Sequence, residues 1–245
     1  MAFMSLSTNM PGGISNAAPW QTMSEAGTPD PSWSQMYHND FNIYTAADWT
    51  VTNTGVTPTN ALAAETGGVL LNTTTAGATD ATFLQLTTAG FLLAANKHIF
   101  FKSRIKQSDA TNSDIYTGLI MTSTTPLTAN DGLFFFKATG ATTWVLRSII
   151  GGVATDLSLG ASNVAVNATY QELGFHIDPL GNVEAFFNPT TGSPGIPVAG
   201  GVRGRVASFA PSLTQVLLAP SFGIRNGAAA AKTMSLDYIT VSAER

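Results

Sequence analysis

The chain has 245 residues, of which 44% are hydrophobic and only 11% carry a charge. This charge content lies well below the roughly 25% of an average globular protein, and the many Thr, Ala, Gly and Asn residues favour β-sheets over helices. The net charge of −4 disfavours a nucleic-acid partner, the absence of Cys excludes disulfides and thiolate metal sites, and the lack of an apolar run of roughly 20 residues excludes a membrane-spanning helix.

The first 40 residues differ from the rest of the chain. They are rich in Pro, Gly and Ser and show no sustained period of either two or 3.6 residues. They nevertheless contain Trp20, Trp33 and Tyr37, whose large rings bury considerable area when they dock on a protein surface. We therefore predict an extended N-terminal arm at 1–40, with these three rings as protein-docking residues, and one folded domain at 41–245. The alternative is a flexible tail with incidental aromatic residues.

Short strand signals, separated by turn residues, continue from about Asp48 to the end of the chain. No segment outside the arm has a convincing helical period. About a dozen strands in about 200 residues fit an all-β domain, an antiparallel β-sandwich of two large sheets. The predicted strands, in chain order, lie in DWTVTN, GGVLLNT, TFLQLT, KHIFFKSRIKQ, DIYTGLIM, GLFFFKA, TWVLRSII, YQELGFHID, NVEAFFN, TQVLLAPSFGIRN and KTMSLDYITVSA.

The segment KHIFFKSRIKQ alternates, as expected for a strand with two different faces. A face made of basic residues is usually solvated, and we predict that role here; a basic binding stripe is the alternative. The basic residues are Lys102, Arg104 and Lys106, and the residues predicted to point the other way are Phe101, Ser103 and Ile105.

The segment ELGFHIDPLGNVEAFFN fits a β-hairpin. Asp178 can bond back to the backbone, Pro179 presets its φ angle for the second position of a turn, and Gly181 tolerates a positive φ angle. The alternation predicts one face toward a core, formed by Leu173, Phe175 and Ile177, and an opposite face that carries Glu172, His176 and Asp178.

Glu172, His176, Asp178 and Glu184 raise the question of a glycan-cleaving enzyme. Hydrolysis of a glycoside needs two carboxyl groups roughly 5 Å or 6.5–9.5 Å apart. Glu184 could approach Glu172 across the hairpin, but any acidic hairpin permits that, and the chain has no E-x-D-x-x-E pattern. We therefore predict that these residues are structural or solvated, that there are no catalytic residues, and that the protein is not an enzyme.

The sequence contains no clear metal or cofactor motif. His38, His98 and His176 lie far apart without metal-ligand spacing, and no Walker loop, dinucleotide fingerprint or G-x-S-x-G elbow is present. The loop DATNSD, Asp109 to Asp114, could offer oxygens to calcium, but it lacks the spacing of an EF-hand loop, so we predict a plain turn. We expect neither a metal nor a cofactor.

Two parts of the sequence resemble known proteins. The hairpin GFHIDPLGNVEAFFN is similar to a hairpin of concanavalin-like and laminin-G-like jelly rolls. The segments ADWTVTNTG, KHIFFKSRIKQSDATNSDIYTGLIMTSTTPLTANDGLFFFKA and SFGIRNGAAAAKTMSLDYITVSAER resemble structural proteins of tailed bacteriophages, and this likeness covers roughly residues 41–245.

The resemblance implies a concanavalin-like jelly roll in a non-enzymatic virion protein, namely a cement or decoration protein on the outer capsid surface. The implied partners are the major capsid protein and further copies of the chain, with a trimer favoured, and the arm is then expected to pack on a neighbouring subunit or on the capsid floor. The alternative is a carbohydrate-binding module or a tail-associated lectin-like adhesion protein. Its candidate glycan-binding rings are Trp144 and Tyr170, although strand rings more often belong to the core; a glycan hydrolase is a distant third.

Overall fold

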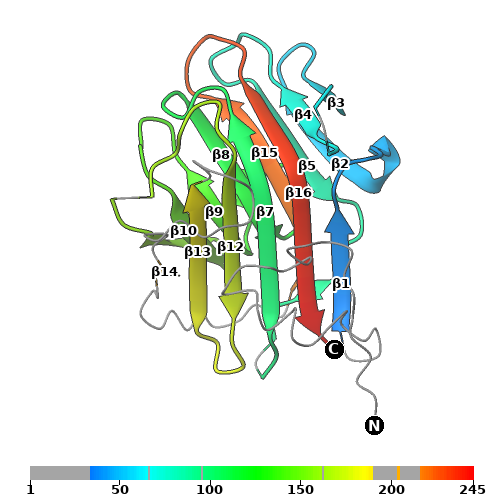
Figure 1. Cartoon of the computed structure of the whole chain (residues 1–245), viewed down its shortest axis with the longest axis vertical. Helices are drawn as coiled ribbons and strands as arrows, with labels where there is room; N and C mark the ends of the chain where they lie inside the picture. The colour runs from blue at the N-terminus through cyan, green and yellow to red at the C-terminus, as the bar shows by residue number, and fades with distance from the viewer. Residues whose placement is uncertain (1–33, 66, 95, 162, 190–202, 205–215) are drawn as a thin grey trace, which may run out of the picture.

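The computed structural model describes residues 34–65, 67–94, 96–161, 163–189, 203–204 and 216–245. These residues form two antiparallel sheets of eight strands each, packed face to face (Figure 1). The predicted antiparallel β-sandwich is therefore confirmed. The helical elements of the described residues are two short 3-10 helices, η1 (Ala46–Asp48) and η2 (Pro126–Thr128). No helix within this part of the chain is long and apolar enough to span a membrane.

The sheet nearest the viewer in Figure 1 is called sheet A here, and β7 lies at its centre. Two strands, β4 and β1, share the same side of β16, because β4 pairs with the first half of β16 and β1 pairs with the second half. In spatial order sheet A contains β14 (Arg203–Gly204), β13 (Val183–Pro189), β12 (Gln171–Ile177), β7 (Ile99–Gln107), β16 (Thr233–Glu244), β4 (Leu70–Thr73) and β3 (Thr59–Leu62), and its eighth strand, β1 (Ser34–Asn39), pairs with β16.

The second sheet, sheet B, lies behind sheet A, with β8 and β15 near its centre. A short strand, β6 (Phe91–Leu92), pairs with the start of β15. In spatial order sheet B contains β11 (Val153–Ser158), β10 (Val145–Ile150), β9 (Gly132–Lys137), β8 (Ser113–Ile120), β15 (Leu217–Asn226), β5 (Ala81–Leu86) and β2 (Trp49–Thr54).

The main core lies between the two sheets and is rich in aromatic rings. Phe101 of β7 stacks on Phe175 of β12, with ring centroids 5.0 Å apart and planes inclined by 14°, because the two residues are cross-strand partners. Phe135 of sheet B meets Phe175 from the other side at 6.1 Å. Aromatic pairs of this kind stabilise a fold by about 0.5–1.5 kcal/mol beyond the area that they bury.

The hairpin predicted at the end of β12 is confirmed in detail. Asp178 accepts hydrogen bonds through Oδ1 from the backbone N–H groups of Leu180, at 2.9 Å, and Asn182, at 2.8 Å. Gly181 has a φ angle of 82°, in the left-handed region that glycine adopts without a steric cost. Asp178 therefore holds the turn between β12 and β13, and its carboxylate is occupied by the turn itself.

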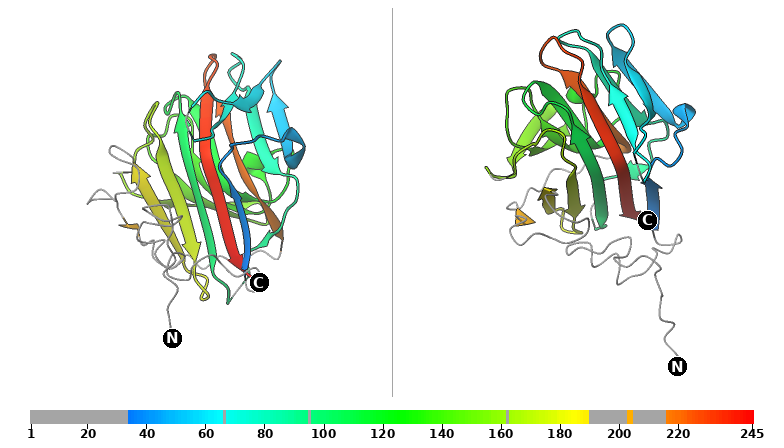
Figure 2. Two further views of the ribbon diagram at one scale, coloured as in Figure 1. Left: turned by 45° about the vertical axis from the view of Figure 1, so that its right-hand side comes forward. Right: turned by 45° about the horizontal axis from the view of Figure 1, so that its top comes forward.

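The predicted boundary of the N-terminal arm needs a correction. Ser34–Asn39 is strand β1, which pairs along its whole length with β16 of the sandwich (Figures 1 and 2). Tyr37 is half-buried, and its ring meets the edge of Trp49 at 6.4 Å within the same molecule. Tyr37 therefore packs on its own domain, whereas Trp20 and Trp33 lie outside the described residues and their docking role stays a prediction.

A lysine lies at one end of the core. Lys137 follows Phe135 on the inward face of β9, and its side chain has no solvent-exposed surface. Its ammonium group donates a hydrogen bond to the carbonyl oxygen of Ala110. Burial lowers the pKa of Lys137 to about 8, although the nearby carboxylates of Asp114 and Asp109 act in the opposite direction. The charged form of this side chain is therefore less favourable in the folded state than in water.

The first prediction concerns β1. We expect Tyr37→Ala to lower the free energy of unfolding by about 2 kcal/mol, because it removes a half-buried ring from the edge of Trp49. Met36→Ala on the same strand is the control, since the Met36 side chain is 47% exposed, and it should change stability by less than about 0.5 kcal/mol. Urea denaturation of both variants measures the difference. Equal losses would show that β1 is held by its backbone pairing alone.

The second prediction concerns Lys137. The folded state binds fewer protons than the unfolded state between a pKa of about 8 and the ordinary value of 10.5, so Lys137 makes stability rise with pH across this window. The rise amounts to about 3 kcal/mol over the whole window. Lys137→Met should remove it, which denaturation curves of both proteins at several pH values would measure. If the free energy of unfolding of both proteins changed with pH in the same way, the lowered pKa of Lys137 would be contradicted.

Candidate binding face on sheet A

The outer face of sheet A follows from the alternation along β7. Every second residue of this strand is buried and faces the core, as predicted for Phe101, Ser103 and Ile105. The residues between them are partly exposed on the outer face of the sheet. The outward residues, together with the one that just precedes the strand, are His98, Phe100, Lys102, Arg104 and Lys106.

The two neighbouring strands bring further side chains to the same face. In the register of β12 with β7, Glu172 lies beside Arg104 and His176 lies beside Phe100. On the other side of β7, Tyr238 of β16 is the partner of Arg104. Cross-strand partners of this kind have Cβ atoms about 4.5–5.5 Å apart, so these side chains are in contact range.

A β-bulge in β16 adds one more carboxylate. The register of β16 with β7 shifts between Leu236 and Tyr238, and Leu236 and Ile239 are both fully buried toward the core. The two residues between them, Asp237 and Tyr238, therefore share the outer face, as occurs where a bulge inserts an extra residue. Asp237 forms an ion pair with Arg104.

Each of the three cations on this face has a carboxylate partner. Lys102 Nζ lies 3.5 Å from Glu172 Oε2, Arg104 pairs with Asp237, and Lys106 Nζ lies 2.8 Å from Glu65 Oε1. The formal charges of these six groups sum to zero. The face is partly solvated, as predicted for the basic residues, but it is a set of ion pairs and not a basic stripe.

Two tyrosines join the ion pairs into one network. Tyr170 donates a 2.8 Å hydrogen bond to Glu65, and the cationic ends of Arg104 and Lys106 lie 4.3 and 4.6 Å from its ring centroid. Tyr238 donates a 2.8 Å hydrogen bond to Glu172. Burial, followed by the adjacent carboxylate, raises the pKa of both phenols, so both hydroxyls remain donors at neutral pH.

Histidines and a phenylalanine form a second cluster near the β12–β13 turn. His176 stacks on Phe100, with ring centroids 4.3 Å apart and planes inclined by 7°. His98 Nδ1 lies 2.9 Å from His176 Nε2, and His176 Nδ1 lies 3.9 Å from Glu184 Oε2. Burial and then the nearby His98 lower the pKa of His176, against the opposite effects of Glu184 and Asp178.

The two glutamates that a glycosidase would need close together, Glu172 and Glu184, lie at different positions in the register of the hairpin. Glu172 is the cross-strand partner of Asn188, whereas Glu184 is the partner of His176, four residues further along β12. At roughly 3.3 Å per residue this offset puts the two backbone positions about 13 Å apart along the strands, so the two glutamates are not cross-strand partners. Glu172 contacts Tyr238 and Lys102, whereas Glu184 lies near His176.

The two rings named as glycan-binding candidates have different positions. Trp144 is fully buried in the core, where its indole N–H donates to Gln171 Oε1 at 3.3 Å, so it cannot contact a ligand at the surface. Tyr170 lies on the candidate face, as described above. The third histidine, His38, is exposed on β1, with Nδ1 2.7 Å from Thr240 Oγ1.

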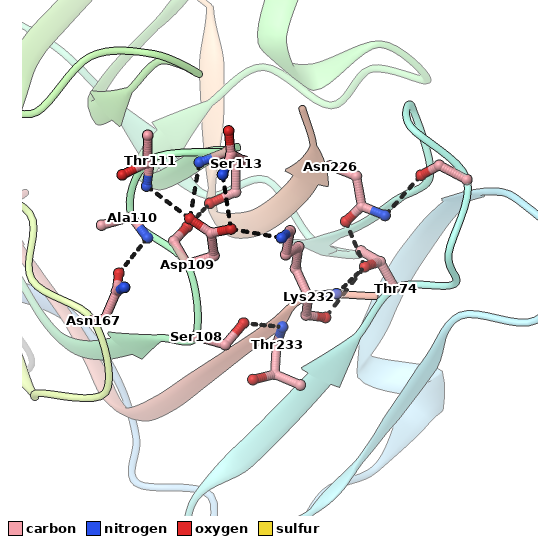
Figure 3. Close-up of polar contacts among 12 residues, drawn as sticks. Thr74, Ser108, Asp109, Ala110, Thr111, Ser113, Asn167, Asn226, Lys232 and Thr233 are labelled. Carbon is pink, nitrogen blue, oxygen red and sulfur yellow. Dashed lines mark hydrogen bonds and ion pairs between the residues drawn. The ribbon is translucent and has the colours of Figure 1, made fainter. Parts of the chain in front are cut away.

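In the loop from Asp109 to Asp114, the carboxylate of Asp109 forms an ion pair with Lys232 (Figure 3). Asp109 Oδ1 accepts hydrogen bonds from the backbone N–H groups of Thr111 and Asn112, both at 2.9 Å, and Oδ2 receives the ammonium group of Lys232 at 2.6 Å. Burial alone would raise the pKa of Asp109, but the hydrogen bonds from Lys232 and Asn112 hold it well below its ordinary range. A lysine thus neutralises the carboxylate that calcium would need. Among the described residues no three His, Asp or Glu side chains are grouped so that they could hold a metal ion.

Comparison with known proteins places the fold. No family model and no curated protein matches the chain. Solved structures do match: a protein of unknown function from Shewanella oneidensis MR-1 shares 11% identity, with a TM-score of 0.59 over 93% of this chain and 94% of that one. The endo-1,3-β-glucanase of Streptomyces sioyaensis shares 12% identity, with a TM-score of 0.55 over 88% and 98%. Peanut lectin shares 6% identity, with a TM-score of 0.53 over 86% and 97%.

These similarities show the fold alone, since the identities are low. The protein has the concanavalin-like jelly-roll sandwich that lectins and glucanases share, so the fold implied by the sequence resemblance is confirmed.

Several residues of the face were not expected there from the sequence, namely Glu65, Phe100, Asp237 and Tyr238, together with His98, which was considered only as a metal ligand. Two of them carried a usable signal, because the alternation that marks Lys102 extends backwards through Phe100 to His98. The others depend on strand register, on the bulge in β16 and on a loop, which local sequence does not specify.

The third prediction tests the loop at Asp109. We expect Asp109→Asn to lower the free energy of unfolding by about 2 kcal/mol at neutral pH, because the charge-assisted hydrogen bond from Lys232 is lost. We expect EDTA to leave the melting temperature of the unmodified protein unchanged, since Lys232 already balances the carboxylate. A fall in melting temperature with EDTA that calcium reverses would contradict this assignment.

Proposed function

We propose that the protein is a non-catalytic, lectin-like module that binds a neutral glycan on the outer face of sheet A. The observation that carries the proposal is the network of paired charges, tyrosine hydroxyls and partly exposed rings that β7, β12 and β16 bring to this face. A sugar presents hydroxyl groups that both donate and accept hydrogen bonds, together with apolar C–H surfaces. A face with donors, acceptors and rings in fixed positions matches both.

The charge balance favours a neutral ligand over an acidic one. The three cations and three carboxylates of the ion pairs sum to zero, and Glu184 adds a further carboxylate near the histidines. A sulfated or uronic-acid glycan would therefore gain no net attraction from this face.

The ion pairs also leave hydrogen-bonding capacity for a ligand. A carboxylate has about four lone-pair positions. Glu65, for example, receives Lys106 and Tyr170, and its side chain remains 36% exposed. A sugar hydroxyl can thus donate to this carboxylate without breaking the contacts that fix it. Such pre-organisation reduces the entropy that binding must offset.

The separation of the glutamates supports binding without hydrolysis. Glu172 and Glu184 are offset by four positions in the register of β12 and β13, and they contact different neighbours, Tyr238 for Glu172 and His176 for Glu184. The shared fold adds support for the ligand class, since two of the similar structures are a β-1,3-glucanase and a lectin.

A second proposal concerns the setting in which the protein acts. The resemblance of residues 41–245 to structural proteins of tailed bacteriophages supports a cement or decoration role on the outer capsid surface. In that role the partner is the major capsid protein and the chain forms a homotrimer. Co-sedimentation with capsids that lack the protein tests this independently of any glycan, and complete absence of capsid binding would refute it.

The fourth prediction tests the glycan proposal. We expect the protein to bind laminarin or barley β-glucan more tightly than heparin or alginate on an immobilised glycan panel. Arg104→Gln should weaken that binding at least about tenfold, because Arg104 lies at the centre of the face and contacts both Asp237 and the ring of Tyr170. Absence of binding to every neutral glycan, or tighter binding to the acidic ones, would contradict the proposal.

The matched control is Arg147→Gln on the outer face of sheet B. Arg147 also pairs with an aspartate, Asp156, and also lies over a ring, with its guanidinium carbon 4.1 Å from the centroid of Phe136. The Arg147→Gln variant should bind glycans as tightly as the unmodified protein. With the same glycans, release of reducing sugar that Glu172→Gln or Glu184→Gln abolishes would identify an enzyme instead.

A further inference from the structure

The two histidines at the end of the candidate face form a hydrogen bond whose donor and acceptor can be assigned. His98 Nδ1 and His176 Nε2 are 2.9 Å apart, and the two ring planes are inclined by only 13°. A nitrogen pair in this geometry shares one proton, so one nitrogen donates and the other accepts. The neighbouring carboxylate decides which one, because Glu184 Oε2 lies 3.9 Å from the remaining nitrogen of His176, Nδ1.

We assign the proton of His176 to Nδ1, where it faces the negative charge of Glu184. The opposite tautomer would place a nitrogen lone pair against that carboxylate. His176 Nε2 then has no proton and accepts the hydrogen bond from His98 Nδ1–H. His98 in turn has its proton on Nδ1, so its other nitrogen, Nε2, carries an open lone pair. The order Glu184, His176, His98 is therefore a relay that ends in a hydrogen-bond acceptor.

We propose that this relay presents His98 Nε2 as an acceptor for a ligand hydroxyl. This rests on the proposed glycan-binding function, and it names a specificity-determining atom that the function alone does not require. His98 is partly exposed at the margin of the face, just before β7, which leaves it within reach of a ligand that covers Phe100.

The charged groups that face the histidine pair are Glu184 on β13, Asp178 in the turn, and Glu244 on β16, whose Oε2 accepts from the backbone N–H of His98 at 2.7 Å. The last contact fixes the backbone of His98 at the start of β7, beside the outer face of the sheet.

The fifth prediction tests the relay itself by nitrogen NMR. The chain has three histidines, so long-range proton–nitrogen spectra of the full-length protein can be assigned with His38→Phe. At neutral pH we expect both His98 and His176 as the Nδ1–H tautomer. Glu184→Gln should shift His176 toward a mixture of tautomers. His176 mainly as the Nε2–H tautomer in the unmodified protein would overturn the relay.

The role of the relay in binding is tested with laminarin or barley β-glucan, whichever the unmodified protein binds. We expect His98→Phe to weaken binding at least about fivefold at neutral pH, because the hydrogen bond from the ligand hydroxyl is lost. His38→Phe, which alters a histidine on the same sheet, should bind as tightly as the unmodified protein. Unchanged affinity of His98→Phe would refute the proposal. Failure of any glycan to bind would refute the proposed function and the acceptor role together, and the tautomer spectra would still decide whether the relay exists.

Discussion

The register of β7 against its two neighbours is the constraint on which the rest of sheet A depends. One set of alternate residues, including Phe101 and Ile105, fills the core, while the other set carries the cations of the outer face. A shift of one residue would exchange the two sets and bury Arg104 without Asp237. The stacking of Phe101 on Phe175 and the ion pairs on the opposite face therefore select the same register from both sides.

The outer faces of the two sheets differ in kind. On sheet B the outward rings Phe83, Tyr116, Phe134 and Phe136 form an apolar cluster whose members are buried. On sheet A the outward residues are charged or polar and partly exposed, with rings interspersed. Within the described part of the chain, sheet A is thus the face that combines hydrogen-bonding groups with access for a ligand, which is why the proposed function belongs there.

Local sequence was sufficient to predict those features that depend on neighbouring residues alone. The alternation in β7 and β12 predicted which side chains face the core, and the Asp-Pro-x-Gly turn predicted the hairpin with its Asp178 contacts. It was insufficient for β1, whose polar sequence is a strand only because β16, about 200 residues later, pairs with it. The same holds for Asp237, which reaches the outer face through a bulge, and for the alternation-poor, exposed β11.

The pairing of β1 with β16 also sets how the sandwich responds to force. The first residue of β1, Ser34, is the partner of Glu244, so the two strands that lead to the ends of the described chain separate from the same point. Tension applied across these two ends would load one pair of hydrogen-bonding residues at a time and open the strands like a zipper. A pull through one end and the body of the sheet would instead load the pairs together in shear. The sandwich should therefore unfold at a much lower force when it is pulled by both ends than when it is pulled by one end and the body of the sheet.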